Sequence, residues 1–243
     1  MTRRWLTIVT LTIGLSALAF GGAFGQSPQL LEDDATRYMV LGDSIAAGYK
    51  AQPATNGFAY RLYNMGVFDR LPHTLFCNAA VPGATSADVL AHQVPQARIP
   101  FDDGGFNPKY IVMTVGGNDL LSILRGADAG TVIQAFADNL LAILLQFMTD
   151  LPDTKIFIAN QYLIPEFIPL GAGIIIPLFN GALAGVASQF PNAVVVDIYT
   201  AFLGRNGLFL IDRHGASPTE VHLTAAGHAA MAHAFADVIE QNK

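Results

Sequence analysis

The chain has 243 residues, of which 52% are apolar and only 13% are charged, and 13 Lys and Arg against 19 Asp and Glu give a net charge of −6. This balance excludes the basic patch that nucleic-acid binding requires. The single cysteine, Cys77, excludes an intramolecular disulfide, and its place after Leu75 and Phe76 predicts burial in a strand. The high apolar content predicts that some apolar surface faces a lipid-like substrate or a membrane.

The N-terminus has the pattern of a targeting segment. Arg3 and Arg4 precede an apolar stretch that runs from Trp5 to Phe24, and Ala23 and Gly25 place small residues where a signal peptidase reads. We therefore predict a signal peptide over residues 1–25, one domain over 26–243, and a secreted or periplasmic protein. An uncleaved anchor is the alternative, since about 20 apolar residues can span a bilayer; glycines at the end of the stretch favour cleavage.

Short apolar runs alternate with longer segments of helical periodicity along the rest of the chain. The predicted strands are Tyr38–Gly42, Thr74–Asn78, Tyr110–Val115, Lys155–Asn160 and Ala193–Ile198. The predicted helices are Tyr60–Phe68, Ser86–Gln93, Thr131–Thr149, Asn180–Phe190 and Thr224–Glu240, the last with Thr224 as its cap. Strands and helices in this order predict an α/β fold, a three-layer α/β/α sandwich with a five-stranded parallel sheet.

One segment departs from this alternation. Residues 162–178 are almost entirely apolar, and Pro165, Pro169 and Pro177 interrupt them. The segment is too short and too rich in proline for a membrane span. Two interpretations stay open: a buried loop that leads into the next helix, or a lid or acyl-chain wall beside a binding site.

Four residues in loops or at the ends of apolar runs have the chemistry of ester hydrolysis. Ser44 follows the first predicted strand and is the candidate nucleophile, and His222, just before the last helix, is the candidate base. Gly83 and the side chain of Asn118, together with the Ser44 backbone N–H, are the candidate oxyanion donors. The order of these residues argues against an α/β-hydrolase, in which the nucleophile lies within Gly-x-Ser-x-Gly well into the chain. The remaining histidines lack such a context: His73, His92, His214, His228 and His233.

On these residues the chain resembles the GDSL, or SGNH, family of serine esterases and lipases. Gly42-Asp43-Ser44 resembles the family's first block, Gly83 its second-block glycine, Gly116-Gly117-Asn118-Asp119 its third block, and His222-Leu223-Thr224 its fifth. The resemblance covers residues 38–227 and implies a flavodoxin-like sandwich. It also implies a carboxylic ester hydrolase that works in two steps through an acyl-enzyme and needs no metal or other cofactor.

The third member of a catalytic triad is the one departure from the family. The family usually carries an aspartate three residues before the histidine, where it orients the imidazole, and here that position is Thr219. Glu220 is the nearest carboxylate, Asp212 is more distant, and a backbone carbonyl near residues 217–220 could hold the ring instead. Glu220 and the carbonyl stay open as alternatives.

We expect a serine esterase or lipase that acts on a small-molecule or lipid ester, with peripheral membrane contact. Two other functions remain: a carbohydrate deacetylase-type esterase, and a non-catalytic lipid-binding or surface-binding module on a degenerate hydrolase scaffold. The first is disfavoured because Trp5 is the only tryptophan available for stacking on sugars, and the second rests on Thr219 alone. Loops 45–57, 99–108 and 162–178 are expected to set the substrate preference; the oligomeric state stays open.

Overall fold

The computed structural model describes residues 36–68, 74–98, 107–205, 207–210 and 220–242. A five-stranded sheet lies at its centre, with strand order β2-β1-β3-β4-β5 and parallel pairing throughout. The strands are β1 (Thr36–Gly42), β2 (Thr74–Asn78), β3 (Tyr110–Thr114), β4 (Lys155–Ala159) and β5 (Ala193–Val196). The predicted five-stranded parallel sheet is confirmed; the predicted strand ends differ from the observed ends by at most two residues.

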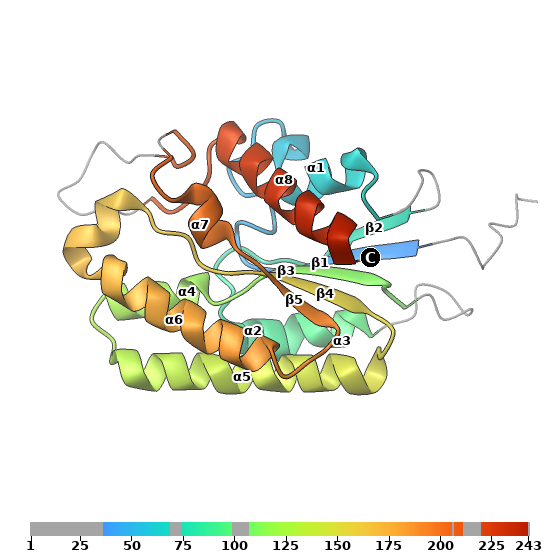
Figure 1. Ribbon diagram of the computed structural model, residues 1–243, viewed down its shortest axis with the longest axis horizontal. Coiled ribbons are helices and arrows are strands. Elements are labelled where there is room, and N and C mark those ends of the chain that lie inside the picture. The colour runs from blue at the N-terminus through green and yellow to red at the C-terminus, as the bar shows by residue number, and fades with distance from the viewer. Residues whose placement is uncertain (1–35, 69–73, 99–106, 206, 211–219, 243) are drawn as a thin grey trace, which may run out of the picture.

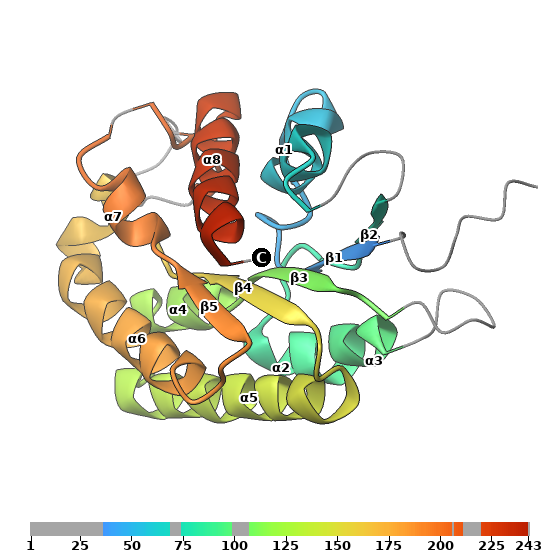
Figure 2. The ribbon, with the colours of Figure 1, turned by 45° about the vertical axis from the view of Figure 1, so that its right-hand side comes forward.

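Helices cover both faces of this sheet, as Figures 1 and 2 show. One layer holds α1 (Phe58–Met65), α7 (Ile198–Phe202) and α8 (Ala225–Asn242). The opposite layer holds α2 (Ser86–Asp88), the π-helical turn η3 (Val89–Gln93), α3 (Val94–Ala97), α4 (Gly117–Leu124), α5 (Ala129–Asp150) and α6 (Ala172–Ala187). Short 3₁₀ turns occur at η2 (Ala54–Asn56) and η4 (Pro165–Leu170). The three-layer α/β/α sandwich is therefore also confirmed.

The central strands are apolar on both sides because helices cover both sides. Every residue of β3 from Ile111 to Thr114, and of β4 from Ile156 to Ala159, is buried. Runs of this kind are typical of a parallel sheet with two covered faces. Cys77 lies in a strand as predicted, but this strand, β2, is at the edge of the sheet and the residue is only partly buried there.

The longest helix, α5, is also the one described helix that is long and apolar enough to cross a bilayer. Its apolar face packs inward through Phe136, Leu140, Ile143, Leu144 and Phe147, all of which are fully buried. It lies against α6 beneath the sheet. Its hydropathy is therefore explained by its place in one helical layer of the domain.

The prediction for residues 162–178 is wrong in part, because much of this segment is helical. The helix predicted to start at Asn180 starts at Ala172, and Pro177 lies inside it. A proline in a helix leaves the carbonyl four residues earlier without its amide donor. Here that residue is Gly173, and both Gly173 and Pro177 are exposed, so water can bind the carbonyl.

The last helix agrees with its prediction. It runs from Ala225 to Asn242, and the Thr224 hydroxyl accepts a hydrogen bond from the Gly227 amide at 3.1 Å. This is the contact expected of a helix N-cap. The predicted signal peptide, residues 1–25, lies outside the described residues.

Candidate active site

The first strand delivers Ser44 to the carboxyl edge of the sheet, where α/β proteins build their sites. The strand ends at Gly42, which pairs with Thr114 of β3. Gly42 has φ +128°, and a Cβ at this position would lie 1.9 Å from the Thr114 carbonyl oxygen. Only glycine fits such an approach. The side chain of Gln93 also holds Gly42 in place, because its oxygen accepts the Gly42 amide at 2.7 Å and its NH₂ group donates to the Gly42 carbonyl at 2.8 Å.

Ser44 and His222 meet although 178 residues separate them. His222 Nε2 lies 3.0 Å from Ser44 Oγ. His222 Nδ1 lies 2.5 Å from Glu220 Oε1. An ionised carboxylate can only accept hydrogen bonds, so Nδ1 carries the proton and Nε2 is free to accept the serine proton. This is the arrangement in which an imidazole can act as a base toward a hydroxyl.

Glu220 is held as an ionised carboxylate. Its Oε1 also accepts the backbone amides of Val221 at 3.0 Å and His222 at 2.9 Å, and its Oε2 pairs with the Lys50 ammonium. Partial burial raises the pKa of Glu220, but Lys50 and the amide and ring of His222 together lower the pKa to about 2. The carboxylate is therefore charged throughout the pH range in which esterases are assayed.

The side-chain amide of Asn118 is held in the pocket beside Ser44 by a neighbouring loop. Asn118 is the second residue of α4, and its Nδ2 donates to the Ala84 carbonyl at 2.8 Å. A side-chain amide has two N–H donors, so one remains for a ligand. Gly83, directly before Ala84, has φ +88° with open space where a side chain would be. The loop that carries Gly83 is thus joined to Asn118 through the carbonyl of Ala84.

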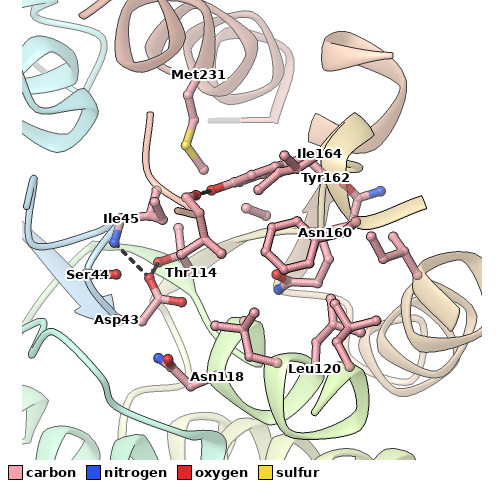
Figure 3. Close-up of a pocket in the computed structure, with 18 residues that line it drawn as sticks. Asp43, Ser44, Ile45, Thr114, Asn118, Leu120, Asn160, Tyr162, Ile164 and Met231 are labelled. Carbon is pink, nitrogen blue, oxygen red and sulfur yellow. Dashed lines mark hydrogen bonds between the residues drawn. The ribbon is translucent and has the colours of Figure 1, made fainter. Parts of the chain in front are cut away.

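Asp43 anchors the loop that carries Ser44. The residue is only 5% exposed, and its Oδ1 accepts the Thr114 hydroxyl at 2.8 Å and the Ile45 amide at 2.9 Å, as Figure 3 shows. Burial raises the pKa of Asp43; the hydrogen bonds and the nearby His222 offset only part of this effect. The bonds of Asp43 to Thr114 and Ile45 hold the backbone on both sides of Ser44.

A second carboxylate, that of Asp119, joins the loop that carries Gly83 to the start of α4, where Asn118 lies. Asp119 accepts the Ser86 hydroxyl at 2.6 Å and the Ser86 amide at 2.8 Å, and Asn139 of α5 donates to the same hydroxyl at 3.0 Å. These contacts fix the loop of Gly83 against the start of α4. Within the described part of the chain, no group of three His, Cys, Asp or Glu side chains is arranged to hold a metal ion.

A largely apolar pocket opens beside Ser44. Its volume is about 670 Å³, including the part that is open to solvent. Figure 3 shows Asp43, Ser44 and Asn118 on one side of the pocket and Tyr162 and Ile164 on the other. The apolar wall is made by Leu120, Leu121, Leu124, Ile164, Phe167, Ile176 and Met231. The Ser44 hydroxyl, within hydrogen-bond reach of His222, thus faces a chamber suited to an apolar group.

The family model for GDSL-like lipases and acylhydrolases matches residues 40–230. The chain belongs to the GDSL-like lipase/acylhydrolase family. As a member of that family it is a carboxylic ester hydrolase, and the alternative of a non-catalytic module is set aside. No significant match was found among curated proteins.

Solved structures of lipolytic proteins and esterases share the fold at low sequence identity. A lipolytic GDSL family protein from Veillonella parvula is 20% identical, with a TM-score of 0.62, 84% of this chain covered and 98% of that one. A lipase from a goat rumen metagenome is 24% identical, with a TM-score of 0.66 and 83% and 96% covered. An acetylxylan esterase from Geobacillus stearothermophilus is 18% identical, with a TM-score of 0.62 and 85% and 95% covered. These similarities bear on the fold alone.

The structure joins three predicted site residues, Ser44, His222 and Glu220, by side-chain hydrogen bonds. Asn118 lies on the wall of the pocket that Ser44 also lines. Thr219 and Asp212 lie outside the described residues. The sequence analysis missed Lys50, whose loop had no recognisable pattern, and the anchoring roles of Asp43 and Asp119. The two aspartates stand within the quoted family blocks, so their adjacency to Ser44 and Asn118 was the available signal.

Proposed function

We propose that this GDSL-family hydrolase is a secreted or periplasmic serine esterase that cleaves lipid-like carboxylic esters, such as lysophospholipids, through an acyl-enzyme on Ser44. The observation that carries the proposal is one pocket in which the Ser44–His222 hydrogen bond faces a wall of seven apolar side chains. A hydroxyl poised against a base suits acyl transfer. An apolar wall suits the hydrocarbon part of an acyl chain.

In the first half-reaction, Ser44 Oγ attacks the ester carbonyl carbon while its proton passes to His222 Nε2. The carbonyl oxygen becomes negative, and the free N–H of Asn118 and the backbone amides of Gly83 and Ser44 donate to it. Glu220 stabilises the imidazolium that forms. When the intermediate collapses, the bond to the alcohol oxygen breaks, and that oxygen takes the proton from His222.

In the second half-reaction, water replaces the alcohol. His222 Nε2 accepts a proton from the water as its oxygen attacks the acyl carbon, and the same oxyanion donors stabilise the second tetrahedral intermediate. Collapse breaks the bond to Ser44 Oγ, which takes back the proton from His222. The carboxylic acid leaves and the enzyme is restored.

The pocket favours an acyl chain over an acetyl group attached to a sugar. Its lining beyond Ser44 and Asn118 is dominated by Leu, Ile, Phe and Met side chains. A sugar site would be expected to present exposed aromatic faces and many hydrogen-bonding groups instead. The inner side of the segment 162–178 supplies Ile164, Phe167 and Ile176 to this wall, which supports the acyl-chain-wall interpretation of that segment.

The test is hydrolysis of p-nitrophenyl esters from acetyl to palmitoyl by the purified protein, beside Ser44→Ala. We expect turnover with an optimum at an acyl chain longer than acetyl, and its loss in the variant. An optimum at acetyl, with release of acetate from acetylated xylan, would instead establish the carbohydrate deacetylase. Turnover that survives Ser44→Ala would refute the acyl-enzyme on Ser44.

Two isoleucines on α6 provide a matched pair for the pocket. Ile176 is buried in the wall, whereas Ile174 on the same helix is 72% exposed. Ile176→Phe should shorten the preferred chain and lower kcat/KM for the longest ester at least about tenfold, since the loss of one methylene contact in an apolar pocket is worth this much. Ile174→Phe should leave the chain-length profile unchanged. The melting temperatures of both variants serve as a control: an unchanged value indicates that the pocket is filled, and a lowered value indicates that the core is damaged.

Peripheral contact with a lipid surface forms part of this proposal. The outer side of η4 and α6 exposes Ile168, Leu170, Ile174 and Leu178, and α6 carries no charged residue. A helix of this composition facing water is unusual for a surface helix. Because the inner side of the same segment forms the acyl wall, the outer side would hold the pocket close to a lipid layer.

Vesicles test this contact. We expect the protein to sediment with phosphatidylcholine vesicles, and Ile174→Lys with Leu178→Lys to abolish sedimentation while leaving hydrolysis of a soluble butyrate ester unchanged. Absence of sedimentation by the unaltered protein would refute lipid contact, and a concentration-dependent dimer lost in the double variant would assign this surface to a second copy of the chain.

The proposed location rests on the N-terminal sequence, in which Arg3 and Arg4 precede the apolar residues 5–24. N-terminal sequencing of the protein from an exporting bacterial host tests it. We expect the chain to begin near residue 26. A chain that keeps residues 1–25 and stays with the membrane fraction would establish the uncleaved anchor.

A further inference from the structure

Lys50 is the one cation in the described part of the chain that pairs with the carboxylate behind the catalytic base. Its ammonium binds Glu220 Oε2, while Oε1 of the same carboxylate faces His222 Nδ1. The Glu220 side chain is only 13% exposed and that of Lys50 is 42% exposed. The four groups therefore form a continuous line of contacts from Lys50 through Glu220 and His222 to Ser44.

The backbone that presents Lys50 is unusual. Lys50 has φ +64°, the only positive φ of a non-glycine residue in the described chain. For an L-residue this conformation is strained, because Cβ approaches the following carbonyl oxygen. Residues other than glycine, asparagine or aspartate hold it only where the surroundings impose it, and such positions cluster at functional sites. The residue before it, Tyr49, places its ring 4.8 Å from the His222 ring.

The loop after β1 thus contacts both the base, His222, and the carboxylate of Glu220 behind it. Ser44 contacts Nε2, Tyr49 lies against the ring, and Lys50 binds the carboxylate that contacts Nδ1. The amides of Val221 and His222 hold one oxygen of the Glu220 carboxylate, Oε1, near the ring, but they leave the other oxygen, Oε2, without a backbone partner. A cation bound to Oε2 fixes this second oxygen as well.

We propose that Lys50 is a positioning residue of the esterase, which holds the Glu220 carboxylate turned toward His222 and offsets its charge. This inference rests on the proposed function of Ser44 and His222. Lys50 does not contact the reacting atoms, so its effect passes through Glu220. Its removal should weaken the orientation of the base and change the charge around it.

The charge effect has a definite sign. The Lys50 cation opposes a second positive charge on the nearby imidazole, so its removal makes the protonated ring easier to form. Activity needs the neutral ring, and the acid limb of the pH profile should therefore move to higher pH. Other titratable groups near the pair are unchanged by the substitution: Asp43 at the end of β1, Tyr49, Tyr162 after β4, and His228 on α8.

The experiment is the pH dependence of kcat/KM of Lys50→Met, Lys50→Arg and Lys109→Met, measured beside the unaltered protein and Ser44→Ala. Lys50→Met should lower plateau kcat/KM about fivefold and move the acid limb up by about half a pH unit, the size expected of a partly exposed ion pair. Lys50→Arg should restore both. Lys109, exposed at the start of β3, is at the opposite edge of the sheet, and its replacement should change neither.

The dependence of the pH profile on salt concentration provides a second test. At 1 M NaCl charges are screened over about 3 Å, so the acid-limb difference between Lys50→Met and the unaltered protein should shrink. An unchanged profile in a folded Lys50→Met protein, as judged by its thermal melt, would reduce the ion pair to a surface contact and overturn the inference. Loss of activity in Lys50→Met with no rescue by Lys50→Arg would overturn it as well. Turnover that persists in Ser44→Ala would refute the proposed function separately.

Discussion

Replacing Glu220 by glutamine removes the negative charge behind His222 while keeping the shape of the side chain. In the unaltered protein, Oε1 receives three donors: the amides of Val221 and His222 and the ring Nδ1. The amide oxygen of a glutamine will occupy that place, because an NH₂ group there would face three donors. The imidazole tautomer is then retained, while the charge and the acceptor for the Lys50 ammonium are lost.

The size of the loss follows from this contact. A hydrogen bond to a charged group contributes about 1.5–3 kcal/mol and a neutral one about 0.5–1.5 kcal/mol, so the imidazolium in the transition state loses about 1.2 kcal/mol. At about 1.4 kcal/mol for each factor of ten, kcat/KM of Glu220→Gln should fall somewhat less than tenfold. Glu220→Ala leaves all three donors without the acceptor and frees the ring, and its loss should be on the order of 10³.

The assay is kcat/KM on the best p-nitrophenyl ester at pH 8 for both variants, with Glu166→Gln as the matched control. Glu166 is an exposed carboxylate on η4, near the pocket but away from His222. A Glu220→Gln protein with unaltered activity would refute the role of the carboxylate and return the base to a Ser–His dyad. Equal losses in Glu220→Gln and Glu220→Ala would show that the charge does not account for the effect.

Three further predictions concern the oxyanion site, pH stability and the strand end. Asn118→Ala should lower kcat by about 10²–10³ with little change in KM, because it removes a donor used in the transition state; an effect confined to KM would contradict this role. Burial, then Arg61 and His222, lower the pKa of His228 to about 4, so the unfolded chain binds more protons between pH 6.5 and 4 and stability should fall on acidification through that window. Urea titrations at pH 7 and pH 4.5 should show this fall in the free energy of unfolding. A fall of the same size in His228→Gln would refute its assignment to His228. The effect of Asp43 has the opposite sign and is present in both proteins, so the comparison between them removes it. Gly42→Ala should cost more than about 3 kcal/mol in urea unfolding, since its Cβ would meet the Thr114 carbonyl, whereas Gly181→Ala, on the exposed side of α6, should be neutral or stabilising.

The sheet was predictable because its signal is local. Runs such as Tyr110–Thr114 and Lys155–Ala159 are apolar over their whole length, and only a sheet covered on both faces requires this. The start of α6 was not predictable in the same way. Pro177 reads as a helix breaker, and only the structure shows that the carbonyl it leaves free, that of Gly173, faces solvent.

The residues of the candidate site likewise differ in how far the sequence predicts them. Ser44, Gly83, Asn118 and His222 follow from short blocks at element ends, where local sequence fixes what each residue can do. Lys50 has no such block, because its role depends on where the loop after β1 lies relative to a residue 170 positions away. A long-range ion pair leaves no trace in the local pattern of one sequence.

Glu220 explains how this chain can manage with Thr219 where the family usually has an aspartate. A glutamate has one more methylene than an aspartate, and its carboxylate can fold back over its own backbone. It does so here, because Oε1 accepts the amides of Val221 and His222 and also contacts Nδ1 of the ring. These bonds make two-residue spacing suffice, and they leave Oε2 for Lys50 to bind. An acid displaced in this way depends on a cation from another loop, which predicts that the activity is more sensitive to salt here than in relatives with the usual aspartate.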